Sequence, residues 1–87
     1  MRGYKITVTD APTLLVAADN LNRTIYVHVV GNSAIALGNA SVTFATGILT
    51  EKHTTPFEIL LPLGETIYAI CNNGTTEDVR VLAPNAD

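Results

Sequence analysis

The chain has 87 residues, a net charge of −3, and 15% charged against 47% hydrophobic side chains. That length predicts one domain with a modest core, and so little charge with so many hydrophobic residues excludes a disordered chain. The five basic residues are scattered along the sequence rather than gathered in a stripe, so we predict no nucleic-acid partner.

Short strands separated by turns are the predicted elements. The first, Lys5–Thr9, alternates between polar and apolar residues, which is typical of a half-buried strand. The second, Thr13–Ala18, is apolar on both faces. The third, Arg23–Val30, is the clearest, because β-branched and aromatic residues fill it. Its predicted faces are Ile25, Val27 and Val29 on one side and Thr24, Tyr26, His28 and Val30 on the other.

The middle of the chain predicts shorter elements. A hairpin-like turn at Gly31–Ser33 leads to a short strand at Ala34–Leu37. Val42–Phe44 is a further candidate strand, and Gly47–Thr55 is predicted to be a loop with an irregular strand near Ile48–Thr50. These segments are rich in glycine, asparagine and threonine, which favour turns over long elements.

Three strands complete the predicted fold, at Phe57–Leu61, Glu65–Cys71 and Asp78–Leu82, and Asn73-Gly74 signals a hairpin between the last two. No window shows a helical period over three turns. Seven or eight short strands at this spacing predict an all-β fold, a small antiparallel β-sandwich or barrel. We predict a single β domain over residues 1–87, of which residues 83–87 form a flexible tail.

No targeting or membrane segment is apparent. The N-terminal residues lack the apolar region of a signal peptide, and no run approaches the roughly 18 apolar residues of a membrane helix. We therefore expect a soluble chain that is made in a cytoplasm and has no membrane partner. The single cysteine, Cys71, excludes an internal disulfide, and its apolar neighbours predict a buried, inert thiol.

Contact with another protein is the activity that the composition favours. The segment Thr24–Thr50 has no charged residue, and interface centres are depleted in charge. Leu14–Ala18, Ile25–Val30 and Ile67–Cys71 are apolar on both faces, although each sandwich strand has only one face on the core. Without helices, we expect a second subunit or another protein to cover the other face; the alternative is a barrel with a small exposed second face. The predicted interface residues are Tyr26, His28, Val30, Asn32, Leu60 and Tyr68.

Catalytic and metal sites find little support in the sequence. His28 and His53 have no ligand-type spacing between them or with Cys71. Ser33 and Ser41 lack the glycine context of a nucleophile elbow. We therefore predict no enzyme, no catalytic residue, no metal, no cofactor and no small-molecule substrate.

The order of several short segments carries a resemblance. Thr13–Ala18 is followed by Arg23–Gly31, by Ala34–Gly38, by Pro56–Gly64, by Glu65–Cys71, by Asn73–Thr76 and by Asp78–Leu82. In this order the chain resembles a family of small virion proteins of tailed bacteriophages, over roughly residues 5–82. It differs from that pattern in the longer polar loop Glu51–Thr55. The resemblance implies a β-sandwich or barrel that decorates or cements a capsid, often as a trimer over a symmetry axis.

These observations predict a bacteriophage capsid decoration protein. It is expected to bind the major capsid protein on the virion surface as a homotrimer, after synthesis in the host cytoplasm. The alternative is a glycan- or host-surface-binding domain of a phage fibre or tail, with a shallow site around Tyr26, His28 or Tyr68. A small hydrolase or metal-dependent domain that uses His28 and His53 is the enzymatic rival.

Overall fold

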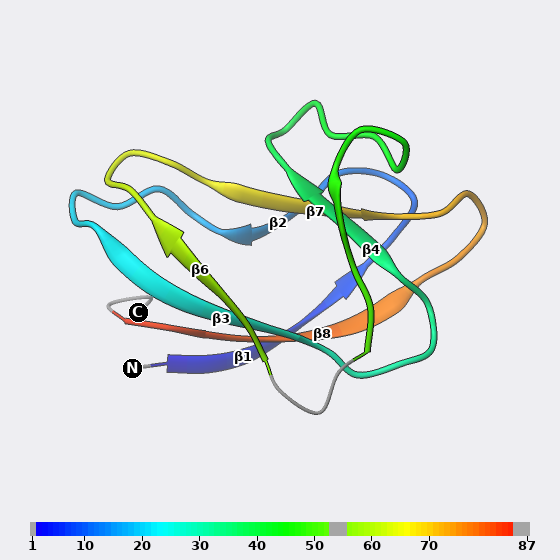
Figure 1. Ribbon diagram of the computed structural model, residues 1–87, viewed down its shortest axis with the longest axis horizontal. Helices are drawn as coiled ribbons and strands as arrows, with labels where there is room; N and C mark the ends of the chain where they lie inside the picture. Colours follow the sequence, from blue (N-terminus) through cyan, green and yellow to red (C-terminus); the bar gives the residue numbers. More distant parts are fainter. Residues whose placement is uncertain (1, 53–55, 85–87) are drawn as a thin grey trace.

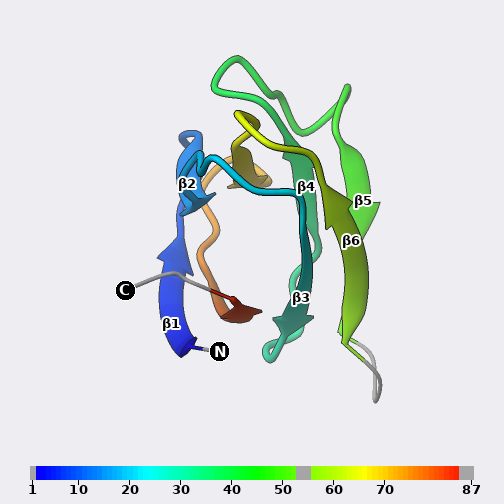
Figure 2. The same cartoon turned by 90° about the vertical axis from the view of Figure 1, so that its left-hand side faces the viewer.

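Within the described residues, eight strands form two antiparallel four-stranded sheets that pack face to face (Figures 1 and 2). The computed structural model describes residues 2–52 and 56–84. The strands are β1 (Arg2–Val8), β2 (Thr13–Val16), β3 (Arg23–Val29), β4 (Ile35–Gly38), β5 (Ile48–Thr50), β6 (Phe57–Leu61), β7 (Ile67–Cys71) and β8 (Glu77–Ala83). Sheet A has the order β1-β8-β3-β6, and sheet B has the order β2-β7-β4-β5.

The connections between the strands make this sandwich a jelly roll. Only β4 and β5 are consecutive in the chain and paired in one sheet. Every other connection passes from one sheet to the other, and β1 pairs with β8 along its whole length. Two four-stranded sheets wound in this way are the double Greek key of the jelly roll. The prediction of a small antiparallel β-sandwich is confirmed.

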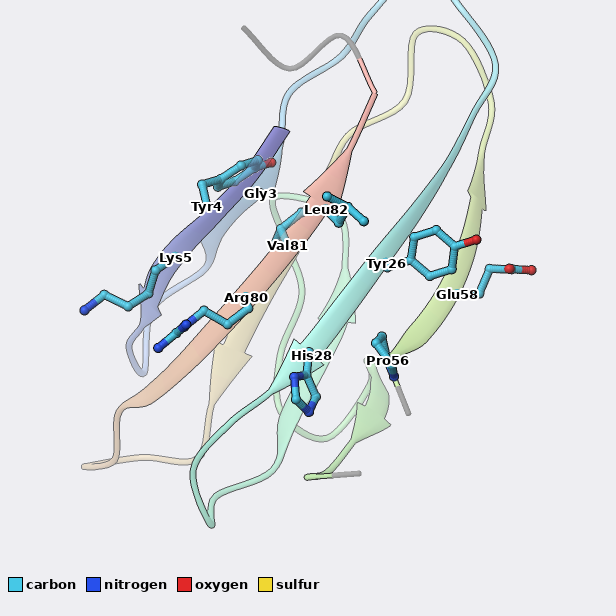
Figure 3. Close-up of a pocket in the computed structure, with 10 residues that line it drawn as sticks. All are labelled: Gly3, Tyr4, Lys5, Tyr26, His28, Pro56, Glu58, Arg80, Val81 and Leu82. Atoms are coloured by element: carbon cyan, nitrogen blue, oxygen red, sulfur yellow. The ribbon is translucent and has the colours of Figure 1, made fainter. Parts of the chain in front are cut away.

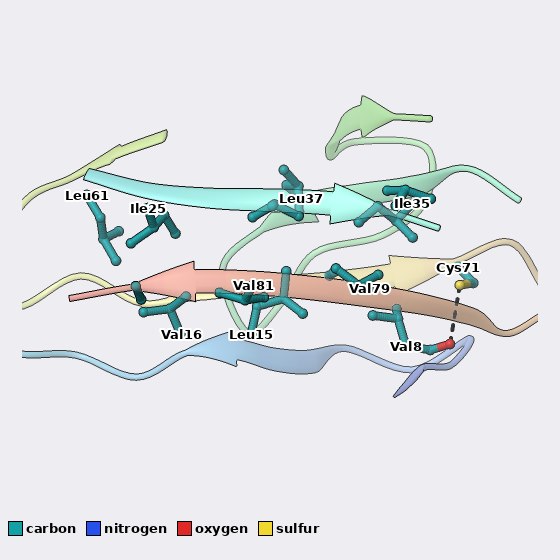
Figure 4. Close-up of a cluster of buried hydrophobic side chains, with 14 residues drawn as sticks. Val8, Leu15, Val16, Ile25, Ile35, Leu37, Leu61, Cys71, Val79 and Val81 are labelled. Carbon is teal, nitrogen blue, oxygen red and sulfur yellow. Dashed lines mark hydrogen bonds between the residues drawn. The ribbon is translucent and has the colours of Figure 1, made fainter. Parts of the chain in front are cut away.

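The core lies between the two sheets and follows the alternation of the strands (Figure 4). In β3, Ile25, Val27 and Val29 are buried as predicted. In β8 the same pattern buries Val79 and Val81. Burying each such side chain contributes about 1.5–3 kcal/mol. The buried residues that meet in this core come from both sheets, so the core holds the sandwich together.

Cys71 lies at one end of the core, and the prediction of a buried thiol is confirmed. Its Sγ donates a hydrogen bond to the Val8 carbonyl oxygen at 3.4 Å (Figure 4). Its backbone N–H donates to the Thr9 carbonyl oxygen at 2.8 Å. Burial is the main cause that raises the pKa of this thiol, and the Glu77 carboxylate adds to it. These contacts join β7 of sheet B to the end of β1 in sheet A.

The centre of the outer face of sheet B is covered by the chain itself, whereas Leu14 and Leu49 on the same face stay exposed. The segment 39–47, between β4 and β5, brings Val42 and Phe44 over Ala36, Ile70 and Tyr68. Two corrections follow. Val42–Phe44 is part of a turn and not a strand, because Gly47 N–H bonds back to Thr43 O at 3.0 Å. The expectation that another subunit must cover the second face of the strand at 67–71 is wrong, since a loop of the same chain covers it.

The predicted hairpins between strands that follow each other also need correction. Gly31–Ser33 and Asn73-Gly74 do turn the chain, and Gly74 has a φ of 80°. Both turns, however, link strands of different sheets. Long-range bonds hold them: Ser33 N–H donates to the buried Glu77 carboxylate at 2.7 Å, and Gly74 N–H donates to Asp10 at 3.0 Å. The local sequence specifies a turn, but not which strands pair beyond it.

The predicted tail begins too early. Ala83, its first predicted residue, is the last residue of β8 and is buried opposite Arg2. Ala83 continues the alternating pattern in which Val79 and Val81 point into the core. Pro84 follows as a turn residue. The other predicted tail residues, 85–87, lie outside the described residues.

Candidate interaction surfaces

The six predicted interface residues do not share one surface. Tyr26 and His28 of β3 and Leu60 of β6 lie on the outer face of sheet A. Val30 follows β3 directly, and Asn32 is exposed in the turn to β4. Tyr68 lies on the outer face of sheet B, packed beside Val42 and Phe44. The structure therefore brings together three of the six.

A groove runs over the outer face of sheet A, and we call it the sheet A groove (Figure 3). It has a volume of about 790 Å³. Strand alternation builds it, because the residues between the buried positions of β3 and β8 point outward. The residues that line it are Gly3, Tyr4, Lys5, Tyr26, His28, Pro56, Glu58, Arg80, Val81 and Leu82.

The strand register arranges these side chains in two rows across the sheet. One row is apolar at its centre: Gly3 pairs with Leu82, Leu82 with Tyr26, and Tyr26 with Glu58. In the second row Lys5 pairs with Arg80, and Arg80 with His28. Two cations thus stand directly opposite each other beside an apolar strip. This is a surface suited to an apolar partner that also carries negative charge.

Tyr26 and Glu58 form the polar end of the apolar row. Figure 3 shows the Tyr26 hydroxyl group pointing towards Glu58. A hydrogen bond to the Glu58 carboxylate is the largest cause that raises the pKa of Tyr26, and the negative charge of Glu58 is the second. Both causes favour the protonated tyrosine, so its hydroxyl group stays a donor to a higher pH than that of an unperturbed tyrosine.

A second surface is the β5–β6 edge, which we define by β5 and β6. Each of these strands is the last of its sheet, and Figure 2 shows both on the same side of the sandwich. Within residues 2–52 and 56–84, no strand therefore pairs with their outer backbone groups. Ile48 is 67% exposed and Leu60 is 74% exposed, and Leu49 and Phe57 are exposed as well. Exposed apolar edge strands of this kind are sites of association.

Sequence reasoning found only Leu60 on this edge. Ile48 and Leu49 lie in the charge-free segment, which was the available signal. Their position at the end of a sheet depends on which strands pair. That pairing joins residues far apart in the chain, so the local pattern does not contain it.

At the opposite side, between β1 and β2, a cleft of about 500 Å³ contains the buried Arg23. One of its terminal nitrogens, Nη2, donates to the Ala17 carbonyl oxygen at 2.9 Å. Its Nε is buried without a hydrogen-bond partner, and nothing in the structure explains that. The bond to Ala17 fixes the connection between β2 and β3.

The side chains that could bind a metal ion are not clustered in the described part of the chain. Residues 2–52 and 56–84 contain no cluster of three or more His, Cys, Asp or Glu side chains. His53, half of the predicted enzymatic rival, lies outside the described residues. Among the described residues there is also no helix long and apolar enough to cross a membrane.

Comparison with known proteins gave no relative. No family model matches the chain, and searches of curated proteins and of solved structures found no match.

Proposed function

We propose that this protein is a bacteriophage capsid decoration protein that binds the assembled head as a homotrimer, through contacts with the major capsid protein. The observation that supports the proposal best is the β5–β6 edge. It exposes Ile48, Leu49, Phe57 and Leu60 beside two strands that lack an outer neighbour. A monomer would leave this surface in water, whereas an assembled protein buries it.

The energies involved are large enough for assembly. A standard interface buries about 800 Å² on each partner. If about 60% of that area is apolar, its burial supplies about 12 kcal/mol before the costs of association. A single domain has a total stability of about 5–15 kcal/mol. Contacts on this scale stabilise both the trimer and the head, because a partner that binds only the assembled state favours it by mass action. Threefold repetition of one contact adds avidity.

The fold is compatible with this role without deciding it. Jelly rolls occur in viral capsid proteins and also in lectins, and one fold supports many functions. The choice between these roles depends on the surfaces. An apolar strand edge favours protein assembly, since it offers backbone groups and hydrophobic contact to another chain.

The test combines molar mass with binding to heads. Light scattering at low micromolar concentration should give three times the 9.2 kDa of one chain. The protein should also sediment with empty heads of the phage that encodes it. Leu60→Lys should weaken head binding by at least about tenfold, as expected for an interface anchor, while leaving the fold intact because Leu60 is 74% exposed.

Ala11→Lys is the matched control, since Ala11 is exposed in the loop between β1 and β2. It should assemble and sediment as the parent protein does. A parent protein that stays monomeric and does not sediment with heads would overturn the proposal.

A second candidate function rests on the sheet A groove. Its partly exposed Tyr26 ring and the donors of Lys5 and Arg80 resemble what a glycan site needs, namely an aromatic platform with polar groups beside it. This is the role of a fibre or tail domain that binds a host surface. Retention of the protein by host polysaccharide, reduced by Tyr26→Ala and not by Tyr68→Ala, would support it over decoration.

A further inference from the structure

Arg23 is a buried cation for which the described residues provide no counterion. Only 4% of its surface is exposed, and arginine is rarely buried so fully unless it is paired. Its Nη2 donates to the Ala17 carbonyl oxygen at 2.9 Å, and its Nε has no partner. No carboxylate within residues 2–52 and 56–84 forms an ion pair with it. A buried charge in this condition is costly, and an anion beside it would reduce the cost.

The guanidinium group of Arg23 borders the cleft of about 500 Å³ between β1 and β2. Nε is the only buried side-chain nitrogen or oxygen without a hydrogen bond in the described part of the chain. Nη1 has no hydrogen bond there either, so it is not buried and stays in contact with the cleft. A ligand in the cleft can therefore reach the guanidinium group at Nη1.

Two side chains of sheet A fix this end of the cleft. The Tyr4 hydroxyl group of β1 donates to the Leu15 carbonyl oxygen at 2.7 Å, and Arg23, at the start of β3, donates to Ala17. Both acceptors lie in or directly after β2, the edge strand of sheet B, which Figure 2 shows on the same side of the sandwich as β1. The cation is therefore held in position before a ligand arrives, which reduces the entropic cost of binding.

The cleft has its own carboxylate, but that group does not neutralise Arg23. Asp19 borders the cleft, accepts the Asn20 N–H at 2.6 Å, and forms no ion pair with Arg23. Arg2 borders the cleft as well, with its guanidinium carbon 5.0 Å from the centre of the Tyr4 ring. An anion that enters would meet a cation whose charge the neighbouring carboxylate leaves available.

A carboxylate is the anion that fits this arrangement. Its planar pair of oxygens matches the guanidinium group, and its single charge matches that of one arginine. Phosphate brings a larger charge and more acceptor oxygens, and Asp19 in the same cleft would repel the extra charge. Ile6, Leu15 and Ala18 also border the cleft, so a short aliphatic chain on the carboxylate would find apolar contacts.

We propose that the cleft between β1 and β2 binds a monocarboxylate with a short aliphatic chain, with the carboxylate at Arg23 and the chain against the apolar residues that border the cleft. Figure 2 shows β1 and β2 across the sandwich from the β5–β6 edge. Of the residues that line the sheet A groove, the cleft shares only Tyr4. The inference does not depend on the homotrimer, because all of the residues it uses belong to one copy.

Pentanoate is the probe, and the NMR signal of the Arg23 Nε–H group reports on the site. Titration with pentanoate should shift this signal and the backbone amide signals of Leu15 and Ala17, and the shifts should saturate with one dissociation constant. Pentanamide has the same chain without the charge and should leave these signals unchanged. The absence of saturable shifts with pentanoate would overturn the proposal. Equal shifts with chloride or inorganic phosphate would indicate an adventitious ion only and would overturn it as well.

Two alanine variants form a matched pair for the same titration. Ala18 and Ala11 are both exposed, but only Ala18 borders the cleft. Ala18→Glu places a second carboxylate there, so it should weaken pentanoate binding by at least about tenfold. Ala11→Glu should bind as the parent protein does. Parent-like binding by Ala18→Glu, or equal weakening by both variants, would contradict the assigned position of the ligand.

Arg23→Met tests the cation itself. It replaces the guanidinium group by an apolar chain and should abolish the saturable shifts of Leu15 and Ala17. Replacing an unpaired buried charge by an apolar side chain need not destabilise a protein, and the urea unfolding midpoint of the variant shows whether it folds. Parent-like binding by folded Arg23→Met would overturn the proposal. If this variant does not fold, the Ala18→Glu and Ala11→Glu pair decides.

Discussion

The outer faces of the two sheets differ in how they treat their apolar side chains. On sheet B, Ala36 and Ile70 lie beneath the loop 39–47, and this small second core contains no charge. On sheet A, Leu82 and Tyr26 remain partly exposed, in a groove between cations and a carboxylate. The centre of one face is covered within the chain, although Leu14 and Leu49 at its sides stay exposed, and the groove on the other face has no such cover among the described residues.

The difference shows when a strand that is apolar on both faces implies a partner protein. Such a strand needs a cover on its outer face, because each strand of a sandwich has only one face on the core. In β7 the cover is a loop of nine residues from the same chain, whereas in β3 no segment of the described chain lies over Tyr26 and His28. Only the uncovered face is evidence for a partner.

The same substitution on the two faces gives the largest expected contrast. Val42 is 6% exposed within the loop over sheet B, so Val42→Lys places an unpaired charge among apolar residues. It should lower the free energy of unfolding by about 3 kcal/mol or more. Tyr26→Lys, on the open face, should cost less than about 1 kcal/mol. Urea unfolding at concentrations too low for assembly measures both.

Equal losses from these two variants would abolish the distinction between a finished and an open face. Val42→Ile is a useful control, because it keeps the site apolar and tests only its volume. It should cost no more than about 1–3 kcal/mol of overpacking.

Substitutions of two glycines by alanine test the same comparison with a smaller expected change in stability. A Cβ at Gly47, under the loop of sheet B, would lie 2.7 Å from the Ala36 Cβ and 2.9 Å from the Leu37 carbonyl oxygen. Gly47→Ala should therefore cost about 1–3 kcal/mol through overpacking. At Gly3 the nearest neighbour is 3.8 Å away, and Gly3→Ala should be neutral or stabilise by up to about 1 kcal/mol. Thermal unfolding of the pair checks the order, and a reversed order would contradict the close packing of the loop.

Much of the fold was predictable, because alternation is a local signal. The faces of Arg23–Val30 and the strand at Phe57–Leu61 follow directly from the period of two. What the sequence could not specify was the assignment of strands to sheets. Asn73-Gly74 is a strong hairpin signal, yet it joins β7 and β8 across the two sheets.

The candidate surfaces were less predictable for the same reason. Tyr26 and Leu82 become neighbours only through the pairing of β3 with β8, over 50 residues apart in the chain. Tyr68 has the same composition signal as Tyr26, but β7 places it against the small cluster of Ala36, Val42 and Ile70. Nothing within the strand at 65–71 distinguishes these outcomes, because the cover comes from a separate loop.

The smallest expected effect concerns the tyrosines of sheet A. The pKa of Tyr26 is raised above 10 first by its hydrogen bond to Glu58, whereas that of Tyr4 is raised first by burial. Glu58→Gln should therefore lower the pKa of Tyr26 towards 10 and leave that of Tyr4 unchanged, as measured by NMR of the ring carbons.

A raised pKa in the folded protein means that the contribution to stability is complete below pH 10 and is lost as the pH rises through the raised value. Glu58→Gln should remove the part of this loss of stability at high pH that is caused by ionisation of Tyr26. An unchanged Tyr26 titration in Glu58→Gln would show that this hydroxyl group and carboxylate do not interact, and the polar end of the groove would then be open to a partner.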